Sequence, residues 1–142
     1  MSGPRVPSLH SVMKEPRPVV AVVDDEEAIR KALKRLLRSA GIAVESYASG
    51  HDFLQSLQVR PPDCVVLDIR MQGLSGFDVQ ARLKAAHAAV PIIFITALDD
   101  PADQARAMHA GAAAFLRKPF DDEALLAAIG AVVKMTPQAP RE

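Results

Sequence analysis

Short apolar runs alternate with helical patterns along this chain. The first run, PVVAVV at 18–23, precedes a helical pattern in which Leu33 and Leu37 fall on one stripe. The strands predicted in this way are 18–23, 42–47, 64–69, 91–96 and 114–117, and the predicted helices are 26–40, a short helix after Ser49, 77–88, 101–110 and 122–134. This strict alternation predicts an α/β fold with a doubly wound parallel sheet.

Residues at the helix ends support these boundaries. Ser49 with Asp52 three residues later is typical of a capping box, and Asp100 followed by Pro101 is typical of a helix start. Gly111 is typical of the left-handed residue that ends a helix. The helix between the last two signals is therefore bounded by the sequence at both ends.

Length and composition limit the classes of protein. A chain of 142 residues has room for one ordinary domain, which we place at 18–134 between a flexible leader at 1–17 and a flexible tail at 135–142. Lys plus Arg equals Asp plus Glu at 17 each, so no net charge favours direct binding to nucleic acid or to a membrane. With one cysteine and no apolar stretch of about 18 residues, we expect a soluble protein of the cytoplasm.

Polar residues suited to phosphoryl chemistry stand at the ends of four apolar runs. Asp24 and Asp25 follow the first run, Asp68 and Thr96 lie at the ends of the third and fourth, and Lys118 follows the fifth. Parallel sheets bind ligands at the carboxyl ends of their strands, so we expect these side chains to meet at one edge. Crowded carboxylates need a cation, and oxygen ligands suit Mg²⁺, which would hold a phosphate donor against a carboxylate nucleophile. Asp68 is therefore a candidate phosphoacceptor.

Each of these residues also has an ordinary structural interpretation. Adjacent acids at a strand end commonly cap the following helix. A lone lysine such as Lys118 is usually a solvated surface residue, although Pro119 restricts its backbone and favours a fixed direction. Taken alone, Thr96 is an ordinary strand residue and Phe115 an ordinary core residue. The chemical interpretation depends on their shared position at strand ends.

Several motifs together resemble one known family. They are Val23-Asp24-Asp25-Glu26-Glu27, Asp68-Ile69-Arg70-Met71, Gly73-Leu74-Ser75-Gly76, and Ala107-Met108 through Gly111 to Lys118-Pro119-Phe120. With these motifs, residues 18–134 resemble the receiver domain of bacterial two-component response regulators, in the CheY-like superfamily and of the FixJ/NtrC-like type. The resemblance implies a single flavodoxin-like (βα)5 domain with a parallel sheet of strand order 2-1-3-4-5.

The resemblance also implies the chemistry of the site. Asp68 would be phosphorylated by a partner histidine kinase. Asp25 and the backbone carbonyl of Arg70 would join Asp68 around Mg²⁺, with Asp24 acting mainly through water. Lys118 would contact a phosphoryl oxygen.

The same resemblance indicates which residues would transmit the signal and which would set the lifetime of the phosphoryl group. Thr96 would follow the phosphoryl group, and Phe115 would change rotamer with it. In this family, polar groups two residues beyond the acceptor and two beyond the threonine help water attack the acyl phosphate; here they are Arg70 and Leu98. Leu98 cannot orient water and Arg70 can pair with the phosphoryl group, so we expect slow hydrolysis. The chain departs from the usual pattern at Gln72 and Ala114, outside the phosphoryl pocket.

Two kinds of function are compatible with these motifs. The first is a signalling receiver that takes a phosphoryl group from a histidine kinase or a histidine phosphotransfer protein and presents its state to a downstream protein. Such a receiver is not an enzyme beyond catalysing its own Mg²⁺-dependent phosphorylation and dephosphorylation. The second is a binding module that has lost phosphorylation, although such modules usually lack one of the acids or the lysine. A third possibility, an aspartyl phosphatase, is disfavoured because such enzymes carry a second acid where this chain has Arg70.

The sequence after residue 134 bears on how the protein would pass on its signal. No helix-turn-helix pattern follows residue 134, so we expect a stand-alone receiver without direct DNA binding. The alternative is the receiver portion of a longer FixJ/NtrC-like transcription factor. We expect a monomer or a weak, phosphorylation-dependent homodimer that uses the surface around the helix at 101–110, where Ala105, Met108, Ala112 and Ala113 lie among few charges.

Overall fold

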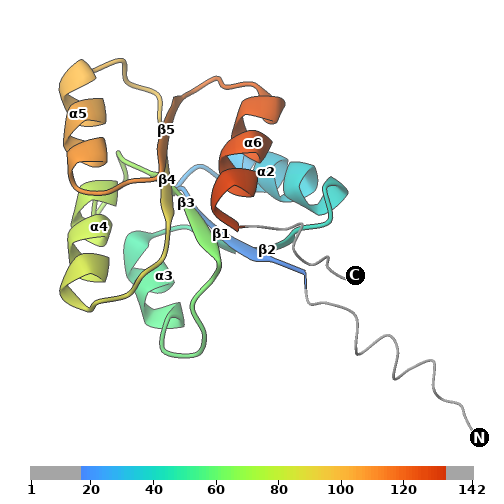
Figure 1. Ribbon diagram of the computed structural model, residues 1–142, viewed down its shortest axis with the longest axis horizontal. Helices are drawn as coiled ribbons and strands as arrows, with labels where there is room; N and C mark the ends of the chain where they lie inside the picture. The colour runs from blue at the N-terminus through green and yellow to red at the C-terminus, as the bar shows by residue number, and fades with distance from the viewer. Residues whose placement is uncertain (1–16, 134–142) are drawn as a thin grey trace, which may run out of the picture.

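The computed structural model describes residues 17–133 and contains one five-stranded sheet (Figure 1). The strands are β1 (Val19–Val23), β2 (Ala43–Tyr47), β3 (Cys64–Asp68), β4 (Ile92–Thr96) and β5 (Ala114–Arg117). The helices that alternate with them are α2 (Glu27–Ser39), α3 (Gly50–Ser56), α4 (Gly76–Ala85), α5 (Pro101–His109) and α6 (Asp122–Val133). Neighbouring strands are all parallel and have the order β2-β1-β3-β4-β5, which confirms the predicted flavodoxin-like α/β fold.

The central strands are the continuous apolar runs of the sequence. Every residue of β3 and β4 is buried, and so are all residues of β1 after its first. Successive side chains of a strand point to opposite faces, and both faces of this sheet are covered by helices, so a polar residue within these strands would be buried on either side. The edge strands β2 and β5 keep partly exposed residues.

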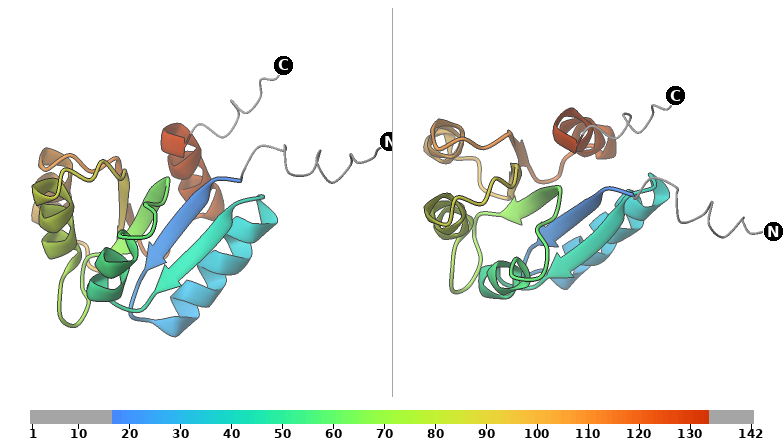
Figure 2. Two further views of the ribbon diagram at one scale, coloured as in Figure 1. Left: turned by 90° about the horizontal axis from the view of Figure 1, so that it is seen from below. Right: turned by 60° about the horizontal axis from the view of Figure 1, so that its bottom comes forward.

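Helices cover the two faces of the sheet in different numbers (Figure 1). One face carries α3, α4 and α5, and the other carries α2 and α6; Figure 2 shows the same arrangement from two further directions. Each face has its own core, with Phe53 and Phe94 in the first and Leu37 and Ile129 in the second. Cys64 lies in the second core, where burial raises the pKa of its thiol to about 12, so it behaves as a small apolar side chain.

Most predicted helix ends are found close to their predicted positions. The Ser49 side chain accepts a hydrogen bond from the backbone N–H of Asp52, and the Asp100 side chain accepts one from the N–H of Ala102. Gly111, after α5, has the left-handed backbone conformation with a φ of +100°. These local signals therefore set the helix boundaries as predicted.

Helix α4 differs most from its predicted range. The sequence predicts a helix at 77–88, but α4 ends at Ala85 because His87 adopts a left-handed conformation with a φ of +55°. Its start carries a complete capping box between Ser75 and Asp78, which the sequence analysis missed.

The predicted boundaries of the domain fall at the limits of the described chain. Except for Arg17, the predicted leader at 1–17 and the predicted tail at 135–142 lie outside the described residues. The domain range of 18–134 stays a prediction. From residue 17 to residue 133, no helix is long and apolar enough to cross a membrane.

Candidate functional site

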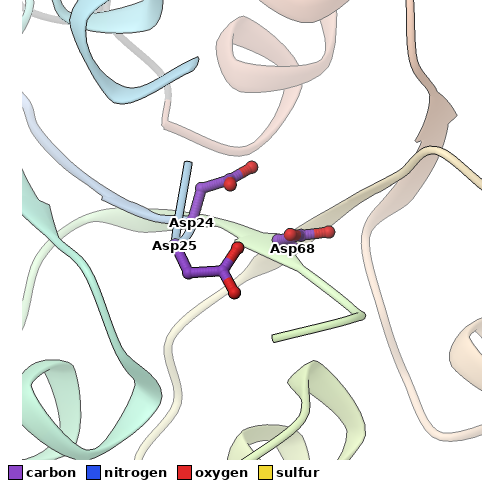
Figure 3. A group of neighbouring side chains, drawn as sticks. All are labelled: Asp24, Asp25 and Asp68. Atoms are coloured by element: carbon purple, nitrogen blue, oxygen red, sulfur yellow. The ribbon is translucent and has the colours of Figure 1, made fainter. Parts of the chain in front are cut away.

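Strand register brings the acidic residues together. Val23 of β1 pairs with Leu67 of β3, so the residues that follow them, Asp24 and Asp68, lie side by side. Asp25 comes next on the β1 side, and carboxylate oxygens of all three acids lie within 4.8 Å of one another. In Figure 3, Asp24 and Asp25 leave the end of β1 with their carboxylates directed toward the side on which Asp68 lies. The predicted convergence of these carboxylates is therefore present.

This acidic cluster fits a hard divalent cation. Asp24 is fully buried and Asp68 is 4% exposed, whereas Asp25 is exposed, so the cluster is open on one side. Repulsion among closely spaced carboxylates is relieved by a cation, and oxygen ligands with room for water suit Mg²⁺. Within residues 17–133, this is the only group of three or more His, Cys, Asp or Glu side chains close enough to share a metal ion.

The loops around the cluster are tied to it through backbone groups. The Gln72 N–H donates a hydrogen bond to Asp25 Oδ2 (3.3 Å), joining the loop after β3 to the end of β1. The Gly76 N–H donates to the carbonyl oxygen of Ile69 (2.9 Å), and a Cβ atom at Gly76 would lie 2.5 Å from the carbonyl oxygen of Asp68. Any larger residue at this position would displace either the start of α4 or the end of β3.

Lys118 lies with its ammonium group at the same edge of the sheet as the acidic cluster. Its Nζ lies 2.9 Å from Asp24 Oδ2, 3.2 Å from Glu26 Oε1 and 3.7 Å from Asp68 Oδ2. Its backbone N–H donates to the carbonyl oxygen of Thr96 (2.8 Å), which fixes the residue directly after β5. Sequence reasoning missed the contact with Glu26, which lies 92 residues away along the chain. The one available signal was the place of Glu26 in the acidic run after β1.

Burial and charge shift the pKa values in the cluster. Burial raises the pKa of Asp68 most, and the charge of Asp24 raises it further; Lys118 and the backbone N–H of Arg70 oppose them, and the pKa is about 7. Burial alone would lower the pKa of Lys118, but its hydrogen bond to Asp24 and the nearby carboxylates outweigh burial and raise it. Without a divalent cation, Asp68 is therefore partly protonated near neutral pH, while Lys118 stays charged.

Thr96 and Phe115 lie on the two strands beyond Asp68. Thr96 is fully buried, and its Oγ1 accepts a hydrogen bond from the backbone N–H of Leu98 (3.2 Å). Phe115 is half-buried against the core under α3, α4 and α5, and it pairs in register with Phe94. A movement of the Thr96 hydroxyl would therefore act directly on the backbone that leads into α5.

The side chain of Arg70 has a partner that the sequence does not indicate. Its guanidinium donates to Asp103 Oδ2 in the first turn of α5, and Asp103 is only 7% exposed. The two residues are 33 positions apart, so no local pattern connects them. The expectation that Arg70 covers a phosphoryl group therefore requires this arginine to leave Asp103.

Comparisons with known proteins agree on one family. Residues 20–130 match the response regulator receiver domain. The response regulator protein TodT of Pseudomonas putida (strain F1) is 41% identical over 133 residues, which cover 91% of this chain and 59% of TodT. The transcriptional regulatory protein FixJ of Azorhizobium caulinodans is 38% identical over 123 residues, which cover 87% of this chain and 58% of FixJ.

A solved structure shows the same likeness in three dimensions. The crystal structure of a response regulator receiver protein from Burkholderia phymatum is 47% identical in sequence with a TM-score of 0.75, and the match covers 84% of this chain and 98% of that one. The chain spans about three fifths of the length of the two curated relatives above. The match to the Burkholderia structure, by contrast, extends over nearly the whole of that chain.

Proposed function

The chain belongs to the response regulator receiver domain family, and on this premise we propose that Asp68 accepts a phosphoryl group from a histidine kinase or a histidine phosphotransfer protein. The observation that carries the proposal is the meeting of Asp24, Asp25 and Asp68 at one edge of the sheet with Lys118 beside them. These residues combine a buried nucleophile, a set of oxygen ligands and a cation for the incoming charge.

In the proposed reaction, a carboxylate oxygen of Asp68 attacks the phosphorus atom of a phosphohistidine. An O–P bond forms while the P–N bond breaks, and the imidazole leaves with the bonding electron pair and a proton from the solvent. Mg²⁺ bound by Asp25, Asp68 and the Arg70 carbonyl, with Asp24 acting through water, would neutralise the charges of donor and acceptor. Lys118 Nζ, 3.7 Å from Asp68 Oδ2, would donate to a phosphoryl oxygen.

We infer that phosphorylation is transmitted by Thr96 and Phe115. A phosphoryl group carries up to about two negative charges and three strong acceptor oxygens, so it would draw the Thr96 hydroxyl toward Asp68. The N–H of Leu98 would then lose its present acceptor, and the backbone leading into α5 would rearrange. On the neighbouring surface, Ala105, Met108 and Ala113 are exposed and available to a partner or a second copy of the chain. The prediction that Ala112 belongs to this surface is wrong, because Ala112 is buried.

This switch is tested by amide chemical shifts with and without Mg²⁺ and the phosphate mimic beryllofluoride. We expect shifts at the acidic cluster and also across residues 101–120, because the structural change passes through Thr96. Asp68→Asn lacks the carboxylate that beryllofluoride would modify, so the shifts across residues 101–120 should not appear in this variant, although Mg²⁺ can still shift the acidic cluster through Asp24 and Asp25. Changes confined to the acidic cluster would contradict the switch and favour a passive phosphoryl relay.

The phosphorylated form is expected to hydrolyse slowly for this family. Leu98 is 48% exposed but carries no group that orients water, and Arg70 is able to pair with the phosphoryl oxygens. The double variant Leu98→Glu with Arg70→Asn should therefore lose its phosphoryl group faster than the wild type. Hydrolysis followed by intact mass measures the two rates, and an equal or slower loss in the double variant would count against the proposal.

The output of the proposed switch has two candidates. A free-standing receiver would present its state to a downstream protein in the cytoplasm, without binding DNA itself. The naming of FixJ as a transcriptional regulatory protein, together with its greater length, favours the alternative that this receiver is part of a longer transcription factor. The reading frame beyond Glu142 distinguishes the two.

A further inference from the structure

The ion pair between Arg70 and Asp103 joins the phosphorylation site to α5. Arg70 lies in the loop between β3 and α4, two residues after Asp68, and Asp103 lies in the first turn of α5. Throughout residues 17–133, Arg70 is the one ion-pair partner of the Asp103 carboxylate, and no other ion pair links this loop to α5. A charge at Asp68 and the position of α5 are thus connected through one side chain.

Helix α5 has few other anchors to the body of the domain. Of its nine residues only Asp103 and Ala107 are buried. Ala107 packs in the apolar core with α4 residues such as Phe77, the Gln80 amide donates to the carbonyl oxygen of Ala107 (3.3 Å), and the Arg106 guanidinium lies 4.0 Å from the centre of the Phe77 ring. Because only two residues of α5 are buried, we expect loss of the ion pair to weaken the attachment of its first turn.

A phosphoryl group on Asp68 would compete with Asp103 for the Arg70 guanidinium. Arg70 follows Asp68 by two residues, and its backbone N–H lowers the pKa of the Asp68 carboxyl, so the root of the arginine side chain lies close to the acceptor. The phosphoryl group offers more charge and more acceptor oxygens than a carboxylate, and arginine binds such oxygens in pairs. The Arg70 side chain is half-exposed, so a path through solvent leads from one partner to the other.

We propose that Asp103 is a positioning residue that holds Arg70 away from Asp68 in the unphosphorylated protein, and that Arg70 exchanges Asp103 for the phosphoryl group after phosphorylation. This inference rests on the proposed phosphorylation of Asp68. The exchange leaves a buried carboxylate without its partner, which is unfavourable until the first turn of α5 moves and Asp103 meets water. The exchange therefore couples phosphorylation to α5 by a second route, beside that through Thr96.

The phosphoryl half-life tests this exchange in a set of variants phosphorylated with acetyl phosphate. In Asp103→Asn the competitor for Arg70 is weakened, so the half-life should lengthen by about two- to fivefold. The same substitution in an Arg70→Gln background should leave the half-life unchanged. Asp100→Ala is the matched control: it removes the cap of the same helix without touching the ion pair, and should keep the wild-type half-life.

Each other outcome overturns the inference. An unchanged half-life in Asp103→Asn, an equal effect in the Arg70→Gln background, or the same lengthening in Asp100→Ala would show that Asp103 does not act through Arg70. If the wild type itself takes no phosphoryl group, the proposed function fails and the exchange fails with it. The wild type gives a further reading that needs no variant: the Nε–H resonance of Arg70 should shift on addition of Mg²⁺ and beryllofluoride, and a resonance that stays in place contradicts the exchange.

Discussion

In the absence of divalent cations, Asp68→Asn should be more stable than the wild type by about 2 kcal/mol at pH 8. The folded wild type holds the Asp68 carboxylate at 4% exposure next to Asp24, which raises its pKa to about 7. The shift of the Asp68 pKa from its ordinary value to about 7 corresponds to roughly 4 kcal/mol of unfolding free energy. We expect Asp68→Asn to gain about half of this stability, because asparagine also loses the attraction of Lys118.

The sign of the pH dependence follows from the direction of this shift. Between about pH 4 and pH 7 the folded state keeps a proton on Asp68 that the unfolded chain has released, so rising pH destabilises the folded wild type through this window. Above that window both states are ionised and the destabilisation is complete. The advantage of Asp68→Asn should therefore be large at pH 8 and small at pH 4.

Urea unfolding at the two pH values, with and without Mg²⁺, measures this difference. Mg²⁺ should stabilise the wild type more than Asp68→Asn, because it binds the carboxylates of the folded state. Asp52→Asn, which changes an exposed acid on α3, is the control and should show no comparable gain. A stability difference that does not change with pH would contradict the conclusion that the charge on Asp68 destabilises the folded state.

Replacing Lys118 by alanine should slow phosphorylation of Asp68 by about 10- to 100-fold. The Nζ group lies within 3.7 Å of carboxylate oxygens of Asp24, Glu26 and Asp68, and a charge-assisted contact to a phosphoryl oxygen in such a site is worth roughly 1.5–3 kcal/mol. Its loss would also remove one positive charge from beside the carboxylates. Both effects weaken the approach of an anionic donor.

The rate with acetyl phosphate, followed by intact mass at saturating Mg²⁺, measures this effect. Lys84→Ala is the matched control, because Lys84 is an exposed lysine on α4 away from the acidic cluster. Lys118→Arg keeps the charge but changes its geometry, so its rate should fall between those of the wild type and the alanine variant. A rate in Lys118→Ala equal to that of Lys84→Ala would remove Lys118 from the proposed mechanism.

The sequence predicts the fold well where the signals are local. Continuous runs of Val, Ile and Leu mark β3 and β4, and the cap at Asp100 with Gly111 bounds α5. The meeting of Asp24 with Asp68 is also predictable, because both stand at the ends of parallel strands. Strand order came from the family resemblance, since alternation alone is compatible with several orders.

The parts that the sequence did not predict depend on contacts between distant segments. Glu26 looks like a helix cap, but its side chain makes no capping hydrogen bond and instead contacts Lys118. Arg70 and Asp103 sit in separate loop and helix patterns that each look complete alone. Such contacts arise from the packing of α5 and the turn after β5 against the sheet, which no local pattern records.

Intact mass after incubation with acetyl phosphate is the most direct measurement of whether Asp68 is a Mg²⁺-dependent phosphoacceptor. The wild type and Asp52→Asn should each gain one phosphoryl group. Asp68→Asn should gain none, and excess chelator should suppress the gain in the wild type. Modification that persists in Asp68→Asn, or that proceeds undiminished in chelator, would contradict this role of Asp68.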